Sequence, residues 1–92
     1  MLSNVNEAKM DTTDDVPITT SVPVYGEIVY GLGRYGSYEA AKPGGVIPTI
    51  AVQNKKRVPW RVGLRKIAGN DIELLDALTK DFVAKYRKLR AA

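Results

Sequence analysis

The last third of the chain shows the clearest periodicity, with apolar residues at steps of three and four. These residues are Ile72, Leu75, Leu78, Phe82, Tyr86 and Leu89. The spacing predicts a C-terminal amphipathic unit over residues 70–92, with a long helix that begins at a cap on Asn70 or Asp71 and ends near Arg90. We expect its apolar face to pack on the rest of the protein. Contact with a second protomer or with a partner protein is the alternative.

Residues 21–42 predict two short helices joined by a tight turn. Ser21 can cap the first helix, and Pro23 suits its first turn because the missing N–H is not needed there. Gly31 can adopt the left-handed conformation that ends a helix. The residue that follows, Leu32, is apolar and can pin the turn to the core.

The second helix, over residues 34–42, has two different sides. The small residues Ser37, Ala40 and Ala41 cluster on one side, which we expect to pack closely against the first helix. The other side carries charged and aromatic residues, namely Arg34, Tyr35, Tyr38, Glu39 and Lys42. A Pro-Gly-Gly run then ends the helix.

From residue 46 onward the pattern changes to the period of two that is typical of a strand. Residues 47–52 predict a first strand, residues 53–56 a polar turn and residues 57–60 a return strand. Together they predict a β-hairpin with Trp60 in the core beneath it. The cationic residues expected at its tip are Lys55, Lys56 and Arg57.

A further short helix or turn is expected over residues 61–69. Val62, Leu64 and Ile67 supply its apolar residues, which we expect to point inward, and Gly69 is placed to stop it. Residues 1–20, in contrast, are polar and acidic and lack periodicity, and they predict a flexible tail. No apolar run is long enough for a membrane span, so a soluble, cytoplasmic protein without a membrane partner is expected.

The composition excludes several kinds of catalytic and metal-binding site. The chain has 92 residues, enough for one small domain, and it contains no cysteine and no histidine. These absences exclude a disulfide scaffold, most zinc sites and the nucleophile pairs that use histidine. We therefore expect neither an enzyme nor a cofactor.

Charge is segregated along the chain. Residues 1–33 carry five acidic side chains against one basic, a net of −4, and residues 34–66 carry eight basic against one acidic, a net of +7. Residues 67–92 carry five basic against four acidic side chains, a net of +1. The basic middle predicts binding to a polyanion such as nucleic acid; a solvated basic surface is the alternative.

Gly31, Gly33 and Gly36 together spell G-x-G-x-x-G, the fingerprint of a dinucleotide-binding loop. That fold needs a preceding strand, a long following helix and an acidic residue about 20 positions further on. Here a proline stops the following helix, a hairpin follows it, and no acidic residue stands between Glu39 and Asp71. The glycines therefore favour a helix-turn-helix, in which Gly31 ends the first helix.

The order helix, turn, helix and basic hairpin resembles the core of the small excisionases, the recombination directionality factors, whose fold is like the winged helix of the MerR group. The resemblance extends over about residues 21–68. Its motifs are Gly31-Leu32, Arg34, Tyr38, Gly45-Val46-Ile47-Pro48 and Arg57-Val58-Pro59. It implies a small α+β winged helix-turn-helix over residues 21–69, with a two-stranded wing and a C-terminal helix after it.

The resemblance implies a sequence-specific, DNA-bending protein without catalytic activity. Such a protein binds repeats in double-stranded attachment-site DNA, associates cooperatively with its own copies there, and directs excision of a phage or integrative element by a tyrosine recombinase. It would act in the bacterial cytoplasm, at the nucleoid. A transcriptional regulator with the same winged-helix fold is the alternative. A third hypothesis is an adaptor whose C-terminal helix docks a protein partner.

The expected DNA contacts follow from this fold. The second helix would enter the major groove, and the hairpin would reach an adjacent phosphate row or the minor groove. The candidate DNA-binding residues are Arg34, Tyr35, Tyr38, Glu39, Lys42, Lys55, Lys56 and Arg57. Arg34 is the first candidate for a base contact, with an ion pair to Glu39 or Glu27 as the alternative. For Tyr38 the alternative is half-buried packing.

Overall fold

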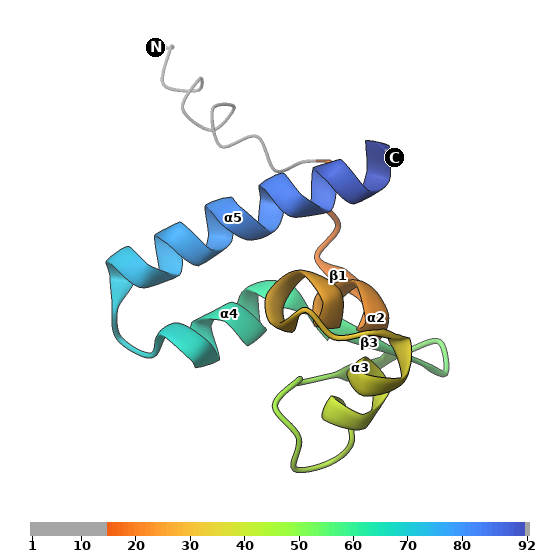
Figure 1. The fold of residues 1–92 in the computed structure, drawn as a ribbon. Helices are drawn as coiled ribbons and strands as arrows, with labels where there is room; N and C mark the ends of the chain where they lie inside the picture. The colour runs from red at the N-terminus through yellow and green to blue at the C-terminus, as the bar shows by residue number, and fades with distance from the viewer. Residues whose placement is uncertain (1–14, 92) are drawn as a thin grey trace.

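A three-stranded antiparallel sheet and four α-helices make up residues 15–91, the part of the chain that the computed structural model describes (Figure 1). The strands are β1 (Thr19–Ser21), β2 (Ile50–Val52) and β3 (Lys55–Pro59). The helices are α2 (Val22–Tyr25), α3 (Arg34–Ala40), α4 (Trp60–Ala68) and α5 (Ile72–Ala91), and α2 continues directly into the π-helical segment η1 (Gly26–Tyr30). The α+β class expected from the sequence is therefore confirmed.

The hairpin of β2 and β3 turns more tightly than the sequence predicts. Gln53 and Asn54 both have positive φ, at 51° and 68°, as a two-residue type I′ turn requires. Lys55 and Lys56 therefore belong to β3, where Lys56 lies opposite Ala51, and not to the turn. The expected cationic tip is wrong in this respect, because the tip itself is Gln53-Asn54. The strand also ends one residue earlier than predicted, since α4 begins at Trp60.

Strand β1 is the largest difference from the sequence prediction. It pairs with β3, which becomes the central strand, in the register Thr20 to Val58. Val16 and Thr20 are buried, and the indole Nε1 of Trp60 donates a 2.7 Å hydrogen bond to the Pro17 carbonyl. Residues 15–20 are thus packed on the domain and are not the flexible tail expected there. The rest of that expected tail, residues 1–14, lies outside the described residues.

The first helix begins and ends at the residues predicted from the sequence. The Ser21 hydroxyl accepts a 3.3 Å hydrogen bond from the Val24 N–H, and Pro23 lies in the first turn. The helix runs on through η1 and ends at Gly31, whose φ of 68° is the left-handed conformation expected of it. Pro23 and Gly31 therefore mark the two ends of one continuous helical segment.

Helix α3 packs on this segment through its small side, as predicted. Ser37 is fully buried against Gly26, where a Cβ atom would collide with the Ser37 hydroxyl. Ala41, just after α3, is also buried. The helix ends at Ala40, two residues earlier than Lys42, the end predicted from the sequence. Pro43 explains the difference, because a proline disfavours the helical conformation in the residue before it.

Trp60 and Phe82 form the centre of the core. Their rings stack with centroids 4.5 Å apart and planes 8° from parallel, which confirms Trp60 as a core residue. Helix α5 is thereby packed on the domain through Phe82, Val83 and Tyr86, as its periodicity predicts. The predicted stripe is wrong at its two ends, because Ile72 and Leu89 are exposed.

The start of α5 is as predicted, but the buried face of α4 is not. Asp71 caps α5, since its Oδ1 accepts a 2.9 Å hydrogen bond from the Leu74 N–H. Of the three α4 residues expected inward only Leu64 is buried, whereas Val62 and Ile67 are 52% and 41% exposed. Residues two apart on a helix lie on nearly opposite sides, so all three could not share one face. The face that packs consists of Trp60, Gly63, Leu64 and Ala68.

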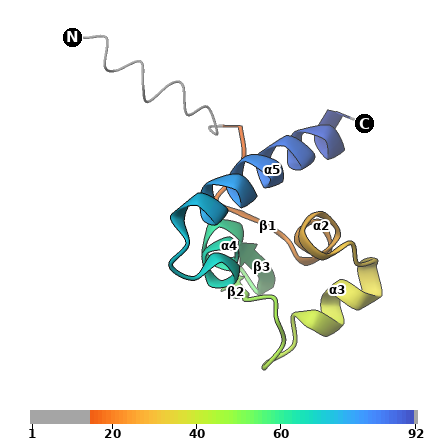
Figure 2. The ribbon, with the colours of Figure 1, turned by 60° about the vertical axis from the view of Figure 1, so that its left-hand side comes forward.

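The elements form layers that both views show. The α2–η1 segment lies between α5 on one side and α3 on the other (Figure 1; Figure 2). The exposed side of α3 and the face of α5 that points away from the core are therefore separate surfaces. No helix within residues 15–91 combines the length and the apolar character that crossing a membrane requires.

Candidate nucleic-acid interface

The exposed side of α3 presents two tyrosines and an arginine. Tyr35 is 78% exposed and Tyr38 is 43% exposed, although both rings are largely apolar. The guanidinium of Arg34 lies over the ring of Tyr38, 5.6 Å from its centroid, as in a cation–π contact. Among the described residues, the ion pairs do not include Arg34, so the pairing with Glu39 or Glu27 considered above is not observed.

Glu39 and Lys42 form an ion pair at the C-terminal end of this surface. Lys42 Nζ lies 3.0 Å from Glu39 Oε2, and both side chains are partly exposed to solvent. The hydrogen bond from Lys42 holds the pKa of Glu39 below its ordinary value, with a smaller contribution from the Tyr35 hydroxyl. Glu39 therefore stays ionised and orients Lys42, while its other lone pairs remain available to a donor.

The three cationic residues of the hairpin do not form one group. Successive side chains of a strand point to opposite faces, so Lys55 and Arg57 share one face of β3, and Lys56 shares the other with the buried Val58. The Arg57 guanidinium is bound to β1, with Nε donating to Thr19 Oγ1 at 3.2 Å and Nη2 donating to the Thr19 carbonyl at 3.1 Å. Arg57 thus joins two strands of the sheet, and Lys55 is the freely exposed cation beside it.

A pocket of about 360 Å³ lies between the end of α3, the α3–β2 connection, β3 and α4. Three lysines line it, namely Lys42, Lys56 and Lys66. The other described residues of the lining are small or apolar apart from Thr49, and none of them is acidic. The pocket therefore brings together two predicted DNA contacts and one cation that the prediction lacked.

Lys66 was not among the DNA contacts predicted from the sequence. Its position two residues after the buried Leu64 places it on the outer side of α4 and identifies it as a surface residue. Nothing local, however, shows that α4 follows β3 at an angle that brings this lysine to the α3–β2 connection. That information resides in the packing of Trp60 at the start of α4.

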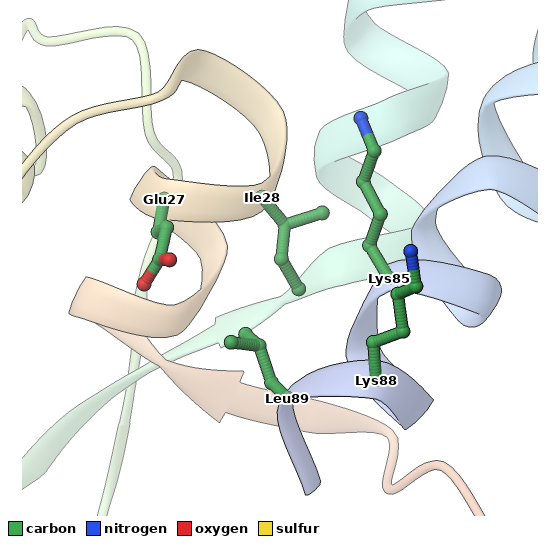
Figure 3. Close-up of a pocket in the computed structure, with 5 residues that line it drawn as sticks. All are labelled: Glu27, Ile28, Lys85, Lys88 and Leu89. Carbon is green, nitrogen blue, oxygen red and sulfur yellow. The ribbon is translucent and has the colours of Figure 1, made fainter. Parts of the chain in front are cut away.

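A second hollow, of about 300 Å³, separates η1 from the C-terminal half of α5 (Figure 3). Glu27 lies on its η1 side and Lys85 and Lys88 on its α5 side, with Ile28 and Leu89 between them. This hollow belongs to the α5 side of the molecule, whereas the three-lysine pocket borders α3.

The three glycines of the G-x-G-x-x-G spelling have separate positions. Gly31 ends η1, Gly33 precedes α3 without a side-chain cap, and Gly36 lies within α3 beside Leu32. A helical segment precedes them where a dinucleotide fold has a strand. Within residues 15–91, histidine, cysteine and carboxylate side chains nowhere gather in threes that could hold a metal ion.

Comparisons of the chain with protein families, with curated proteins and with solved structures gave no match.

Proposed function

We propose that the protein binds double-stranded DNA as a small winged helix-turn-helix, with α3 as the recognition helix and the β2–β3 hairpin as the wing. The observation that carries this proposal is the two-sided character of α3. Its small side is locked against Gly26 by the buried Ser37, while its other side exposes an arginine and two tyrosines, and Lys42 follows its C-terminal end. Such a helix can approach a groove closely and present side chains that bind bases and phosphates.

The arrangement of residues suits insertion of α3 by its N-terminal end. Arg34 is the first residue of the helix, where recognition helices contact base edges, and it can bind a guanine with two hydrogen bonds. Tyr35 is exposed next to it and can contact a base or the backbone. Lys42 follows the other end of the helix, where the phosphate backbone would pass.

The hairpin supplies the second contact. Lys55 is exposed on one face of β3 and Lys56 on the other, so a wing in this position has cations on both sides. Arg57 holds the base of the wing through Thr19, so its main contribution is to fix the orientation of the hairpin relative to β1. A positioned wing costs less conformational entropy on binding than a mobile one.

The biological role that we propose is that of an excisionase-like directionality factor. The support is the resemblance of residues 21–68 to that family, together with the basic surface of α3 and the hairpin. In this role several copies bind adjacent repeats of attachment-site DNA and bend it. A tyrosine recombinase then excises the element from the resulting complex. Bending adds shape selectivity to the contacts made by α3.

Footprinting and bending assays with the full chain on attachment-site DNA test this role. Several adjacent protected sites, a bend detected by circular permutation, and stimulation of excision by the recombinase are the expected results. A single protected and unbent operator, without an effect on excision, would instead support the transcriptional regulator. Absence of any duplex binding would contradict both.

A further inference from the structure

We propose that the three-lysine pocket holds a single backbone phosphate of the bound duplex, and that α4 is in this way part of the DNA interface. The inference rests on the proposed function and adds to it a defined phosphate site and a residue, Lys66, outside the helix-turn-helix and the wing. The site requires three cations to converge on one anion.

The three lysines come from three separate elements. Lys42 follows α3, Lys56 lies in the central strand β3, and Lys66 lies in the second half of α4. Side chains of one sign repel one another, and a fold gains nothing for its own stability by grouping them around one hollow. Their grouping around a pocket of about 360 Å³, which has no acidic lining residue within residues 15–91, is therefore best matched by an external anion.

Lys42 can take part although it is paired with Glu39. The pair is exposed, with 63% of the Lys42 side chain and 43% of the Glu39 side chain accessible. Its interaction free energy is therefore small, and an incoming anion can compete with Glu39 for Lys42. An ammonium group also has three donors, and one ion pair occupies only part of this capacity. Glu39 thus keeps Lys42 near the pocket until the phosphate arrives.

The wall of the pocket is fixed by the backbone of the α3–β2 connection. The Ile47 N–H donates a 3.0 Å hydrogen bond to the Ala40 carbonyl, and the Gly45 N–H donates a 2.7 Å hydrogen bond to the Lys42 carbonyl. Gly45 lies so close to the Ala40 carbonyl that a Cβ atom would collide with it. With Ile47 buried as an anchor, the connection is held against the end of α3, and the pocket does not need to form anew on binding.

The lining favours a phosphate over a base or a carboxylate. Lysines act as compact point charges that suit phosphate oxygens, whereas a base would need an aromatic platform or a planar hydrogen-bonding group. Among the residues that the structure describes, no aromatic side chain and no arginine lines the pocket. A backbone phosphate is also the anion that a duplex would bring to a site between the end of its recognition helix and its wing.

The salt dependence of DNA binding tests the shared site. The slope of log K against log salt changes by about 0.9 for each phosphate that is neutralised. If three lysines share one phosphate, the triple variant K42Q/K56Q/K66Q should make this negative slope shallower by about 1 in total. Three independent contacts would make it shallower by about 3 and would overturn the shared site.

Lys66→Gln alone tests the role of α4. Binding to the specific duplex and to an unrelated duplex should weaken by the same factor, because a phosphate contact carries no sequence information. Lys80→Gln is the matched control, since Lys80 lies on α5, is paired with Asp76 and has 78% of its side chain exposed. Equal binding by K66Q and wild type, while wild type binds DNA normally, would overturn the inference and leave the proposed function intact.

Methylphosphonate substitution identifies the phosphate directly. Duplexes in which one phosphate at a time is neutral should include a single position at which K66Q and wild type bind equally well. If K66Q remains weaker at every position, Lys66 acts through a diffuse field or through the fold, and the site is wrong. If wild type shows no duplex binding at all, the proposed function itself fails. Thermal melting of K66Q alongside wild type checks that the fold is retained.

Discussion

The ring of Phe82 lies flat on the indole of Trp60, 4.5 Å away between centroids, and joins the longest helix to the start of α4. Each of the two residues has only 1% of its surface exposed. Because this stack is the centre of the core, α5 belongs to the same folded unit as the sheet and the other helices. Its role must be tested by point variants, since deletion would remove part of the core.

Phe82→Ala is expected to destabilise the protein by about 3–5 kcal/mol, the usual cost of truncating a buried phenylalanine. Urea denaturation followed by circular dichroism measures this change. Ile72→Ala is the control on the same helix, because Ile72 is exposed, and its effect should stay within about 0.5 kcal/mol. Equal stability of F82A and I72A would show that the stack does not hold α5 on the domain.

Gly36→Ala is expected to raise the free energy of unfolding by up to about 1 kcal/mol, because alanine favours the helix interior over glycine by that amount. A Cβ atom at Gly36 would meet Leu32 at 3.5 Å, an ordinary contact. The same change at Gly26 should destabilise, since the new methyl group would collide with the buried Ser37. Parallel thermal melts of G36A and G26A would contradict this if both moved in the same direction.

If α3 approaches DNA as proposed, Gly36→Ala has a second effect. The added methyl group thickens the helix next to Tyr35, and specific DNA affinity is expected to fall while stability rises. A gel-shift titration with G36A that has passed the thermal melt measures the loss. Unchanged affinity would mean that this turn of α3 does not approach the duplex closely.

Tyr25→Phe is expected to leave stability unchanged or to raise it by up to about 1 kcal/mol. The Tyr25 hydroxyl is buried without a hydrogen-bond partner in the described part of the chain, and burial raises its pKa strongly. An unpaired buried hydroxyl costs free energy, which phenylalanine avoids at almost the same volume. Tyr86→Phe is the matched change, and it should cost about 0.5–1 kcal/mol because Arg90 donates a 3.0 Å hydrogen bond to that hydroxyl.

Arg34→Ala and Lys56→Ala should separate base reading from phosphate binding. R34A is expected to lose about 1–3 kcal/mol on the specific site, with little change on unrelated DNA. K56A should weaken both by the same factor and flatten the salt dependence. Fluorescence anisotropy at several salt concentrations measures both effects. Unchanged binding in both variants would place the DNA surface elsewhere on the molecule.

The ion pair between Asp15 and Arg87 predicts a pH effect. Arg87 donates two 2.9 Å hydrogen bonds to the Asp15 carboxylate and holds its pKa below the ordinary value. Because the pKa is lower in the folded state, the contribution to stability is complete above the unfolded pKa of about 3.9 and disappears as pH falls through the folded value.

Asp15→Asn should therefore lower the melting temperature slightly near neutral pH and have no effect in strong acid. The effect is small, since the pair is exposed to solvent. Melting curves of wild type and D15N between neutral pH and strong acid measure the difference. A gap between them that widened toward acid would contradict the pairing, and with it the anchoring of Asp15 on α5.

Sequence patterns predicted the features that depend on near neighbours. Ser21, Gly31 and Asp71 act at helix ends, and each contacts a backbone group within a few residues. The α5 stripe was predictable because Phe82 and Tyr86 repeat with the period of a helix. The small side of α3 was also predictable, since Ser37 and Ala41 are one turn apart.

Features that depend on distant partners were not predictable. Strand β1 has only three residues, too few to show a period, and its hydrogen bonds come from a strand 38 residues later. The tight hairpin turn relies on a positive φ at Gln53, a conformation that glutamine rarely adopts. Lys66 joined Lys42 and Lys56 only through the packing of α4, so local charge density could not indicate that these three share a pocket.

Trp60, the single tryptophan of the chain, touches both ends of the described fold. Its indole N–H is bonded to the Pro17 carbonyl, and its ring is covered by Phe82. Release of either the N-terminal strand segment or the C-terminal helix would expose the same indole to water and shift its fluorescence to the red. One intrinsic fluorophore thus reports on both contacts, and variants at the buried Val16 or at Phe82 would tell the two signals apart without an added dye.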